Sequence, residues 1–160
     1  METLEVHPGT HAVAAGRDTI LEARSLGATL AVAAWDEAAG VGGLLVCAFL
    51  KTPGDFAPAG PEPLESTERG LKAFFAELVD QAAQPARLKV YLAGTAEFLS
   101  APDALNLGAR LRRAVRKVLE QNGVAVAAEH VGGAANRDIR LDTRTGGVTV
   151  TVDKGREVRL

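Results

Sequence analysis

The chain has 160 residues, 47% of them apolar and 24% charged, and a net charge of −2 at neutral pH. These values are typical of a soluble single domain spanning residues 1–160, and the weak negative charge gives no electrostatic reason to expect a nucleic-acid partner. No apolar run is long enough to span a membrane, and the first residues lack the regions of a signal peptide. We therefore expect a cytoplasmic protein without membrane insertion. The single cysteine excludes an internal disulfide.

Two histidines near the start have the spacing of a helical metal pair. His7 and His11 lie four residues apart, but Pro8 and Gly9 between them disfavour a helix, and no acidic residue or third histidine stands beside them as a further ligand. We expect solvated loop histidines, and we predict neither a metal site nor a cofactor. Residues 1–9 predict a frayed start or a short edge strand.

Two apolar runs, Ala28–Trp35 and Leu44–Leu50, predict the central strands of a sheet. The connection at residues 36–43 contains Gly40, Gly42 and Gly43 and predicts a β-hairpin turn. Because both runs are almost continuously apolar, their strands need cover on both faces.

Two amphipathic helices are expected to supply part of this cover. After a Pro/Gly-rich surface loop at 51–65, a helix capped by Ser66 or Thr67 carries an apolar face, and a second helix capped by Asp103 carries another. The first face comprises Leu71, Phe74, Phe75, Leu78 and Val79. The second comprises Leu107, Leu111, Val115, Val118 and Leu119. The other side of the second helix is basic, which suits either a solvated surface or an acidic partner: Arg110, Arg112, Arg113, Arg116 and Lys117.

The last third predicts short strands that turn at glycines. Strands are expected at Val124–Glu129, Asp138–Asp142 and within Thr145–Val150, and the charged tail at 153–160 is expected to fray. The predicted fold class is α/β: a single-domain layered sandwich with a mixed β-sheet and two main amphipathic helices packed on it.

The glycine-bearing blocks resemble a known family. Residues 23–30 read ARSLGATL, residues 41–46 read VGGLLV and residues 127–137 read AAEHVGGAANR. The CheD chemoreceptor glutamine deamidases carry T-x-G-L-G-S-C-V, V-G-G-L-A-H and V-A-E-D-x-G-G-x-x-G-R in the same order. The resemblance covers roughly 13–152. It implies an α/β sandwich that deamidates glutamine side chains of chemotaxis receptors with a cysteine nucleophile. It also implies binding to receptors and to CheC-type phosphatases.

The residues that would carry this chemistry are replaced. The family cysteine falls on Thr29, the family histidine on Val46, and the threonine six residues before the cysteine on Ala23. We therefore expect no catalytic residue at these positions. Cys47 and His130 are the weak alternatives for nucleophile and base. Cys47 neighbours Val46 on a strand, so it should face away from the family site as a buried core cysteine with a raised pKa.

Three functions remain open from the sequence. The favoured one is a non-catalytic CheD-like protein of a chemosensory system that binds a chemoreceptor or a CheC-like phosphatase. The alternative is an active amidohydrolase, a receptor glutamine deamidase whose nucleophile site has been rebuilt, for example from Thr29 and His130. The third is an α/β domain unrelated to chemotaxis.

Overall fold

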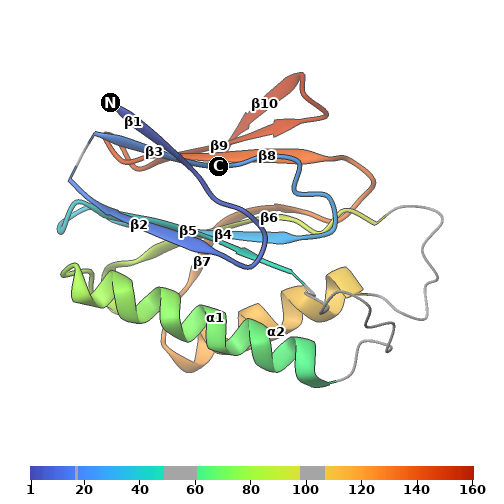
Figure 1. Cartoon of the computed structure of the whole chain (residues 1–160), viewed down its shortest axis with the longest axis horizontal. Coiled ribbons are helices and arrows are strands. Elements are labelled where there is room, and N and C mark those ends of the chain that lie inside the picture. The colour runs from blue at the N-terminus through green and yellow to red at the C-terminus, as the bar shows by residue number, and fades with distance from the viewer. Residues whose placement is uncertain (17, 49–60, 98–106) are drawn as a thin grey trace.

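The computed structural model describes residues 1–16, 18–48, 61–97 and 107–160, which form three layers (Figure 1). An outer sheet stacks on a middle sheet, and two helices cover the opposite face of the middle sheet. The outer sheet has the order β1 (Glu2–Glu5), β3 (Thr19–Ala23), β8 (Arg137–Asp142), β9 (Gly147–Val152), β10 (Arg156–Arg159). The middle sheet has the order β2 (His11–Ala15), β5 (Val41–Cys47), β4 (Leu30–Asp36), β6 (Lys89–Gly94), β7 (Val126–Val131). The helices are α1 (Pro61–Asp80) and α2 (Leu107–Gln121). No described helix is both long and apolar enough to cross a membrane.

The predicted hairpin lies at the centre of the middle sheet. β4 and β5 are antiparallel neighbours flanked by β6 and β2, and every residue of both strands is buried. β6 pairs with β7 in parallel, as β1 does with β3, so both sheets are mixed. The predicted α/β sandwich with two packed helices is confirmed. The division of the strands between two sheets was not predicted.

The hairpin turn is shorter than predicted. It comprises residues 37–40, and both Gly42 and Gly43 lie inside β5. A Cβ at Gly43 would lie 2.6 Å from the Phe74 ring of α1, and one at Gly42 would lie 3.0 Å from Leu141 of β8. The two glycines therefore allow the layers to approach closely on either side of β5, and the chain does not turn at them.

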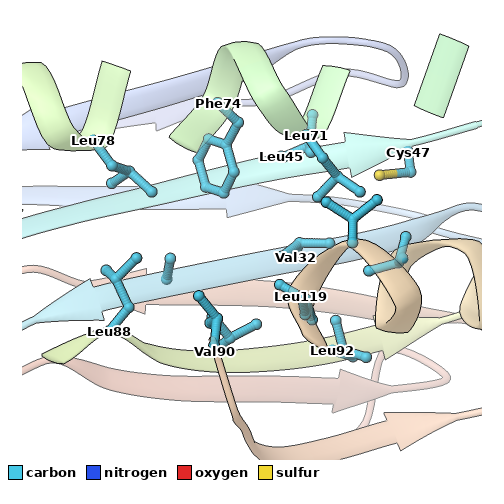
Figure 2. Close-up of a cluster of buried hydrophobic side chains, with 14 of the residues drawn as sticks. Val32, Leu45, Cys47, Leu71, Phe74, Leu78, Leu88, Val90, Leu92 and Leu119 are labelled. Atoms are coloured by element: carbon cyan, nitrogen blue, oxygen red, sulfur yellow. The ribbon is translucent and has the colours of Figure 1, made fainter. Parts of the chain in front are cut away.

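β4 and β5 contribute to two apolar clusters, because alternate side chains of a strand point to opposite faces. The helix-facing cluster includes Val32, Leu45, Cys47, Leu71, Phe74, Leu78, Leu92 and Leu119 (Figure 2). The intersheet cluster includes Leu21, Ala23, Ala31, Ala33, Trp35, Leu44, Val46, Ile139, Leu141 and Val150. Burial of each large apolar side chain contributes roughly 1.5–3 kcal/mol, so these two clusters supply most of the driving force for folding.

α1 begins earlier than predicted. It starts at Pro61, so residues 61–65 are helical and do not belong to the surface loop. Proline is tolerated in a first turn because its missing N–H would have no acceptor within the helix. Ser66 and Thr67 lie inside the helix, so the predicted cap is wrong. Val79 is 48% exposed and lies at the flank of the buried stripe, so its predicted burial is also wrong.

α2 buries most of the face that its sequence predicts. Leu111, Val115, Val118 and Leu119 are all buried beneath the helix. The predicted cap at Asp103 lies outside the described residues. Residues 49–50 of the second apolar run and 51–60 of the predicted loop also lie outside them.

The C-terminal tail is ordered, contrary to the expected fraying. β10 pairs antiparallel with β9, with Val158 opposite Val150. Val158 and Leu160 pack against the intersheet cluster, and the Leu160 N–H donates to the Val148 carbonyl at 2.9 Å. Val158 and Leu160, the apolar residues of this otherwise charged tail, are therefore sufficient for the tail to pair as an edge strand of the outer sheet.

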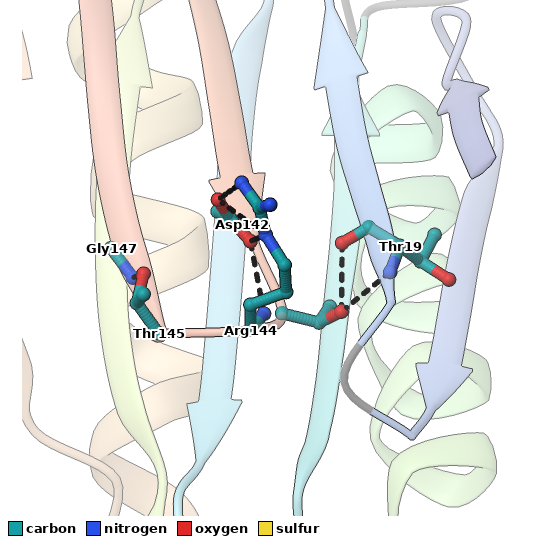
Figure 3. Close-up of polar contacts among 6 residues, drawn as sticks. Thr19, Asp142, Arg144, Thr145 and Gly147 are labelled. Atoms are coloured by element: carbon teal, nitrogen blue, oxygen red, sulfur yellow. Dashed lines mark hydrogen bonds and ion pairs between the residues drawn. The ribbon is translucent and has the colours of Figure 1, made fainter. Parts of the chain in front are cut away.

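A threonine links the β8–β9 turn to the start of β3. The Thr19 N–H donates to the Thr143 hydroxyl at 2.9 Å, and that hydroxyl donates to the Thr19 carbonyl at 2.7 Å (Figure 3). In the same turn the Arg144 guanidinium binds the Asp142 carboxylate at 2.8 Å and holds the pKa of Asp142 below its ordinary value. These contacts stabilise the outer sheet at the end of β8 opposite Arg137, away from Thr29.

Asp36 joins the hairpin turn to the segment that follows α1. Its carboxylate is fully buried and accepts hydrogen bonds from the Ala39 N–H, the Gln84 N–H and the guanidinium of Arg87, in the 3-10 turn η1 (Pro85–Arg87). Burial alone would raise the pKa of Asp36, but these hydrogen bonds and the Arg87 charge outweigh it and hold the pKa below 3.8. The folded state therefore favours the ionised carboxylate.

Replacement of this carboxylate should lower stability in a pH-dependent way. Because the pKa of Asp36 is lower in the folded than in the unfolded chain, its contribution is present above about pH 4 and is lost as the pH falls through the folded-state pKa. We expect Asp36→Asn to cost about 2–3 kcal/mol at pH 7 and less at pH 3, measured by urea unfolding. The exposed Asp80→Asn should change little; equal losses from Asp36→Asn at both pH values would contradict the prediction.

Candidate functional site

Val46 and Ala23 lie in the intersheet cluster and do not reach the surface. Each is 1% exposed, Val46 on β5 and Ala23 on β3. The segment before β2 closes over β5, since the Gly9 N–H donates to the Val46 carbonyl at 2.8 Å and the Val46 N–H donates to the Thr10 carbonyl at 3.1 Å. Two of the three positions on which the resemblance places the family's catalytic residues are therefore closed off by packing.

Thr29 lies just before β4 and is half-buried. Its hydroxyl donates to the Leu26 carbonyl at 2.6 Å, and its own carbonyl accepts the Thr95 N–H at 2.8 Å. Among the residues that the structure describes, no histidine makes a hydrogen bond with Thr29. Its hydroxyl closes the preceding turn, which is a structural role.

A buried arginine organises the region beside Thr29. Arg137, the first residue of β8, is 4% exposed, and its guanidinium donates to the carbonyls of Gly94 at 3.1 Å and Gly132 at 2.6 Å. The Gly94 carbonyl also accepts the Gly132 N–H at 3.0 Å, so the ends of β6 and β7 are tied together. The sequence did not predict this role of Arg137, and its only signal was an arginine four residues after the Gly132–Gly133 pair.

His130 on β7 belongs to the same cluster. Its Nδ1 accepts a hydrogen bond from Arg137 Nε at 2.7 Å. Burial, followed by the charges of Arg137 and Arg156, lowers the pKa of His130 below 6.5, which favours the neutral imidazole that can accept this bond. The structure places Thr29 and His130 at the same end of β6 but gives each a different partner, so the Thr29–His130 pair is not formed.

Arg112 connects α2 with this cluster. Its guanidinium donates to the Thr95 hydroxyl at 2.7 Å, and that hydroxyl donates to the Gly94 carbonyl at 2.8 Å. Thr95 is fully buried, and its N–H is the one that binds the Thr29 carbonyl. One residue of the basic face of α2 therefore lies against the candidate site and is not simply solvated.

Cys47 lies on the opposite face of β5 from Val46. It belongs to the helix-facing cluster, where its thiol is surrounded by apolar side chains such as Leu71 (Figure 2). Burial raises the pKa of the Cys47 thiol to about 12. The predictions that Cys47 is buried and lies on the opposite face from Val46 are confirmed.

The burial of Cys47 predicts low reactivity. Because the thiolate is the reactive form and a pKa of about 12 leaves almost none at neutral pH, the folded protein should label slowly with a thiol reagent. Addition of denaturant should make labelling fast, and the ratio of the two rates, measured by mass spectrometry, should exceed about 100. Rapid labelling of the native protein would make Cys47 a candidate nucleophile again.

The two N-terminal histidines do not face each other as a metal pair. The His11 Nε2 lies 2.6 Å from the Glu77 carboxylate of α1, a contact between distant segments that the sequence did not reveal, while His7 is exposed. In the part of the chain that the structure describes, no group of three or more His, Cys, Asp or Glu side chains is placed to hold a metal ion.

Comparison with known proteins agrees with the resemblance in the sequence. A family model described as CheD chemotactic sensory transduction matches residues 57–152. The probable chemoreceptor glutamine deamidase CheD 2 of Anaeromyxobacter dehalogenans is 30% identical in an alignment 160 residues long, gaps included, that covers 94% of each chain. The probable chemoreceptor glutamine deamidase CheD of Pyrococcus abyssi is 30% identical over 147 residues, 91% of this chain and 88% of that protein. Among solved structures, the hypothetical protein YfiH of Bacillus licheniformis is 11% identical, with a TM-score of 0.47 over 78% of this chain and 49% of that one.

Proposed function

The chain belongs to the CheD family, and on that premise we propose that it is a non-catalytic, cytoplasmic protein of a chemosensory system. It acts by binding a protein partner, either a chemoreceptor or a CheC-type phosphatase. The observation that carries the proposal is the identity of the residues at the family's catalytic positions, Thr29, Val46 and Ala23, together with the burial of Val46 and Ala23.

Amide hydrolysis by the family's route needs a thiolate that attacks and a base that takes up and returns a proton. A threonine hydroxyl is a weak nucleophile unless a base lies beside it, and valine cannot transfer a proton. Losing a nucleophile and its base from one site lowers the rate by many orders of magnitude. The contacts of Thr29 support the proposal, because its hydroxyl donates to the Leu26 carbonyl and not to a base.

The alternative is an active amidohydrolase with a rebuilt nucleophile site, and it has less support. Cys47 is buried on the helix-facing side of the middle sheet, opposite Val46, and its raised pKa disfavours the thiolate. The Nδ1 of His130 is occupied by Arg137. Neither residue has the contacts that an attacking group and its base require.

The proposal is tested on the cytoplasmic fragment of a chemoreceptor from the same organism. The purified protein is incubated with this fragment, the glutamine-containing peptides are analysed by mass spectrometry for deamidation, and the binding of the fragment and of a CheC-type phosphatase is measured separately. We expect binding to one of the two without deamidation. Deamidation by the unmodified protein that is abolished by Thr29→Ala or Cys47→Ala would overturn the proposal and identify the nucleophile. Absence of binding to both proteins would also overturn it.

A further inference from the structure

A groove runs between α2 and the edge of the middle sheet. This α2–β7 groove has a volume of about 530 Å³ and is lined on one side by Arg116, Leu119 and Glu120 of α2. Its other side consists of residues 124–129, which are mainly valine and alanine and end in Glu129. A second hollow of about 500 Å³ continues from it across the cationic side chains of α2 and shares Arg116 and Glu120 with it. The groove and the second hollow, which is lined by Arg113 and Lys117, together present an apolar wall beside a basic wall.

The apolar wall is the end of a sheet. β7 is the last strand in the order of the middle sheet, and no strand of the described residues pairs with its outer side. Ala127 is exposed at this edge and lies where the register between β6 and β7 shifts. An uncovered strand edge with small apolar side chains is a surface on which another protein segment can pack.

Part of the charge on the basic wall is not balanced by a described acidic side chain, although Arg116 pairs with Glu129 of β7. α2 carries one acidic residue, Glu120, against five basic residues: Arg110, Arg112, Arg113, Arg116 and Lys117. Arg113 and Lys117 are exposed, lie one helical turn apart, and have no hydrogen-bond or ion-pair partner among the described residues. Like charges at this spacing repel each other and destabilise a helix. The described part of the chain supplies no acidic side chain that pairs with either residue and so relieves this repulsion.

We propose that the α2–β7 groove is a docking site for an acidic segment of a protein partner that also carries apolar side chains. The proposal rests on the proposed function, because it assigns a surface to the partner binding. Charge complementarity selects the occupant: an acidic segment pairs with Arg113 and Lys117, and its apolar side chains contact residues 124–128.

Two other anionic partners fit the groove less well. Glu120 and Glu129 line it, and both would repel the continuous phosphates of a nucleic acid. A lipid surface is best bound by large apolar side chains that insert into it, but the exposed large apolar residues of the described chain are Met1 and Val79, outside the groove. A protein segment can instead place acidic and apolar side chains in alternation.

The second hollow, which is lined by Arg112, adjoins the candidate site through a short chain of contacts. Arg112 on the same helix donates to Thr95, and the Thr95 N–H donates to the Thr29 carbonyl. A segment bound along α2 therefore lies next to the site at which the family's chemistry would take place. This position suits a protein that keeps partner binding without turnover.

The test uses charge reversal on the basic wall. The probe is the purified cytoplasmic fragment of a chemoreceptor from the same organism, or its CheC-type phosphatase, together with an array of overlapping synthetic peptides that cover both proteins. We expect Arg113→Glu with Lys117→Glu to weaken binding at low salt by at least about tenfold, and 0.5 M salt to weaken the unmodified protein similarly. The matched control is Lys72→Glu with Lys154→Glu, which makes the same change of net charge at two exposed positions away from the groove. It should leave affinity within about twofold.

The apolar wall is tested independently by Ala127→Glu, with Ala76→Glu on the exposed face of α1 as its control. Ala127→Glu should weaken binding, Ala76→Glu should not, and circular dichroism and thermal unfolding should show that both remain folded. Peptides that bind should be acidic. Partner binding that is unchanged by both groove variants would overturn this inference and leave the proposed function standing, whereas absence of any partner binding would remove the proposed function itself. Groove-dependent binding to vesicles containing phosphatidylserine, with no binding to the receptor fragment, phosphatase or peptides, would also overturn the inference.

Discussion

Gly94→Ala should lower the free energy of unfolding by more than about 4 kcal/mol, the largest effect that we expect of a single methyl group in this protein. Gly94 has a φ of 122°, and a Cβ there would lie 2.1 Å from the Thr29 carbonyl oxygen. The obstacle is backbone, so a side-chain rotation cannot relieve the clash. A shift of either strand would also break the hydrogen bonds that Arg137 and the Gly132 N–H donate to the Gly94 carbonyl. Urea unfolding monitored by circular dichroism measures the loss.

Gly123→Ala is the matched control for this prediction. Gly123 also has a positive φ, 67°, but an added Cβ would meet no atom within 4 Å. It should cost only the conformational penalty of the left-handed region, about 1–2 kcal/mol. A loss at Gly94 no larger than that at Gly123 would show that β4 and β6 can separate at this point without cost.

Restoration of the family's three residues should not restore the family's activity. We expect the combined change Thr29→Cys, Val46→His and Ala23→Thr to give no deamidation of a receptor fragment and to lower stability by about 2–4 kcal/mol. Val46 and Ala23 are each 1% exposed in the intersheet cluster, so an imidazole and a hydroxyl there would be buried among apolar side chains. Mass spectrometry of the glutamine peptides measures the activity, and thermal unfolding measures the stability.

Thr29→Cys alone separates the effect on activity from the effect on stability. It removes the hydrogen bond to the Leu26 carbonyl at a half-buried position, which should cost about 1 kcal/mol, and it leaves the new thiol without a base. Turnover by the triple variant would mean that these three residues alone separate the chain from catalysis, and that the packing around Val46 opens readily.

The sequence predicts where the candidate site lies, because the family's motifs are short blocks of fixed spacing. The glycine-bearing blocks predict Thr29, Val46 and Ala23 as its positions, and the alternation of strand side chains predicted that Cys47 faces away from Val46. The partners of these residues could not be predicted. Arg137 meets Gly94 and His130 across three strands, and Arg112 meets Thr95 from a helix, so these contacts join positions that are distant in sequence.

The sequence by itself determined the elements whose pattern is local: the apolar hairpin strands, the buried stripes of both helices and the glycine turns of the last third. Only the tertiary structure decided how the strands divide between two sheets. Each strand forms backbone hydrogen bonds with neighbours that can be distant in sequence, and the residue pattern within a strand does not specify which neighbours these are. The tertiary structure likewise decided the role of Gly42 and Gly43, which lie inside β5 because α1 and β8 approach on opposite faces. The ordered tail has the same cause: Val158 and Leu160 have too few apolar neighbours in sequence to predict a strand, but the intersheet cluster supplies the surface that buries them.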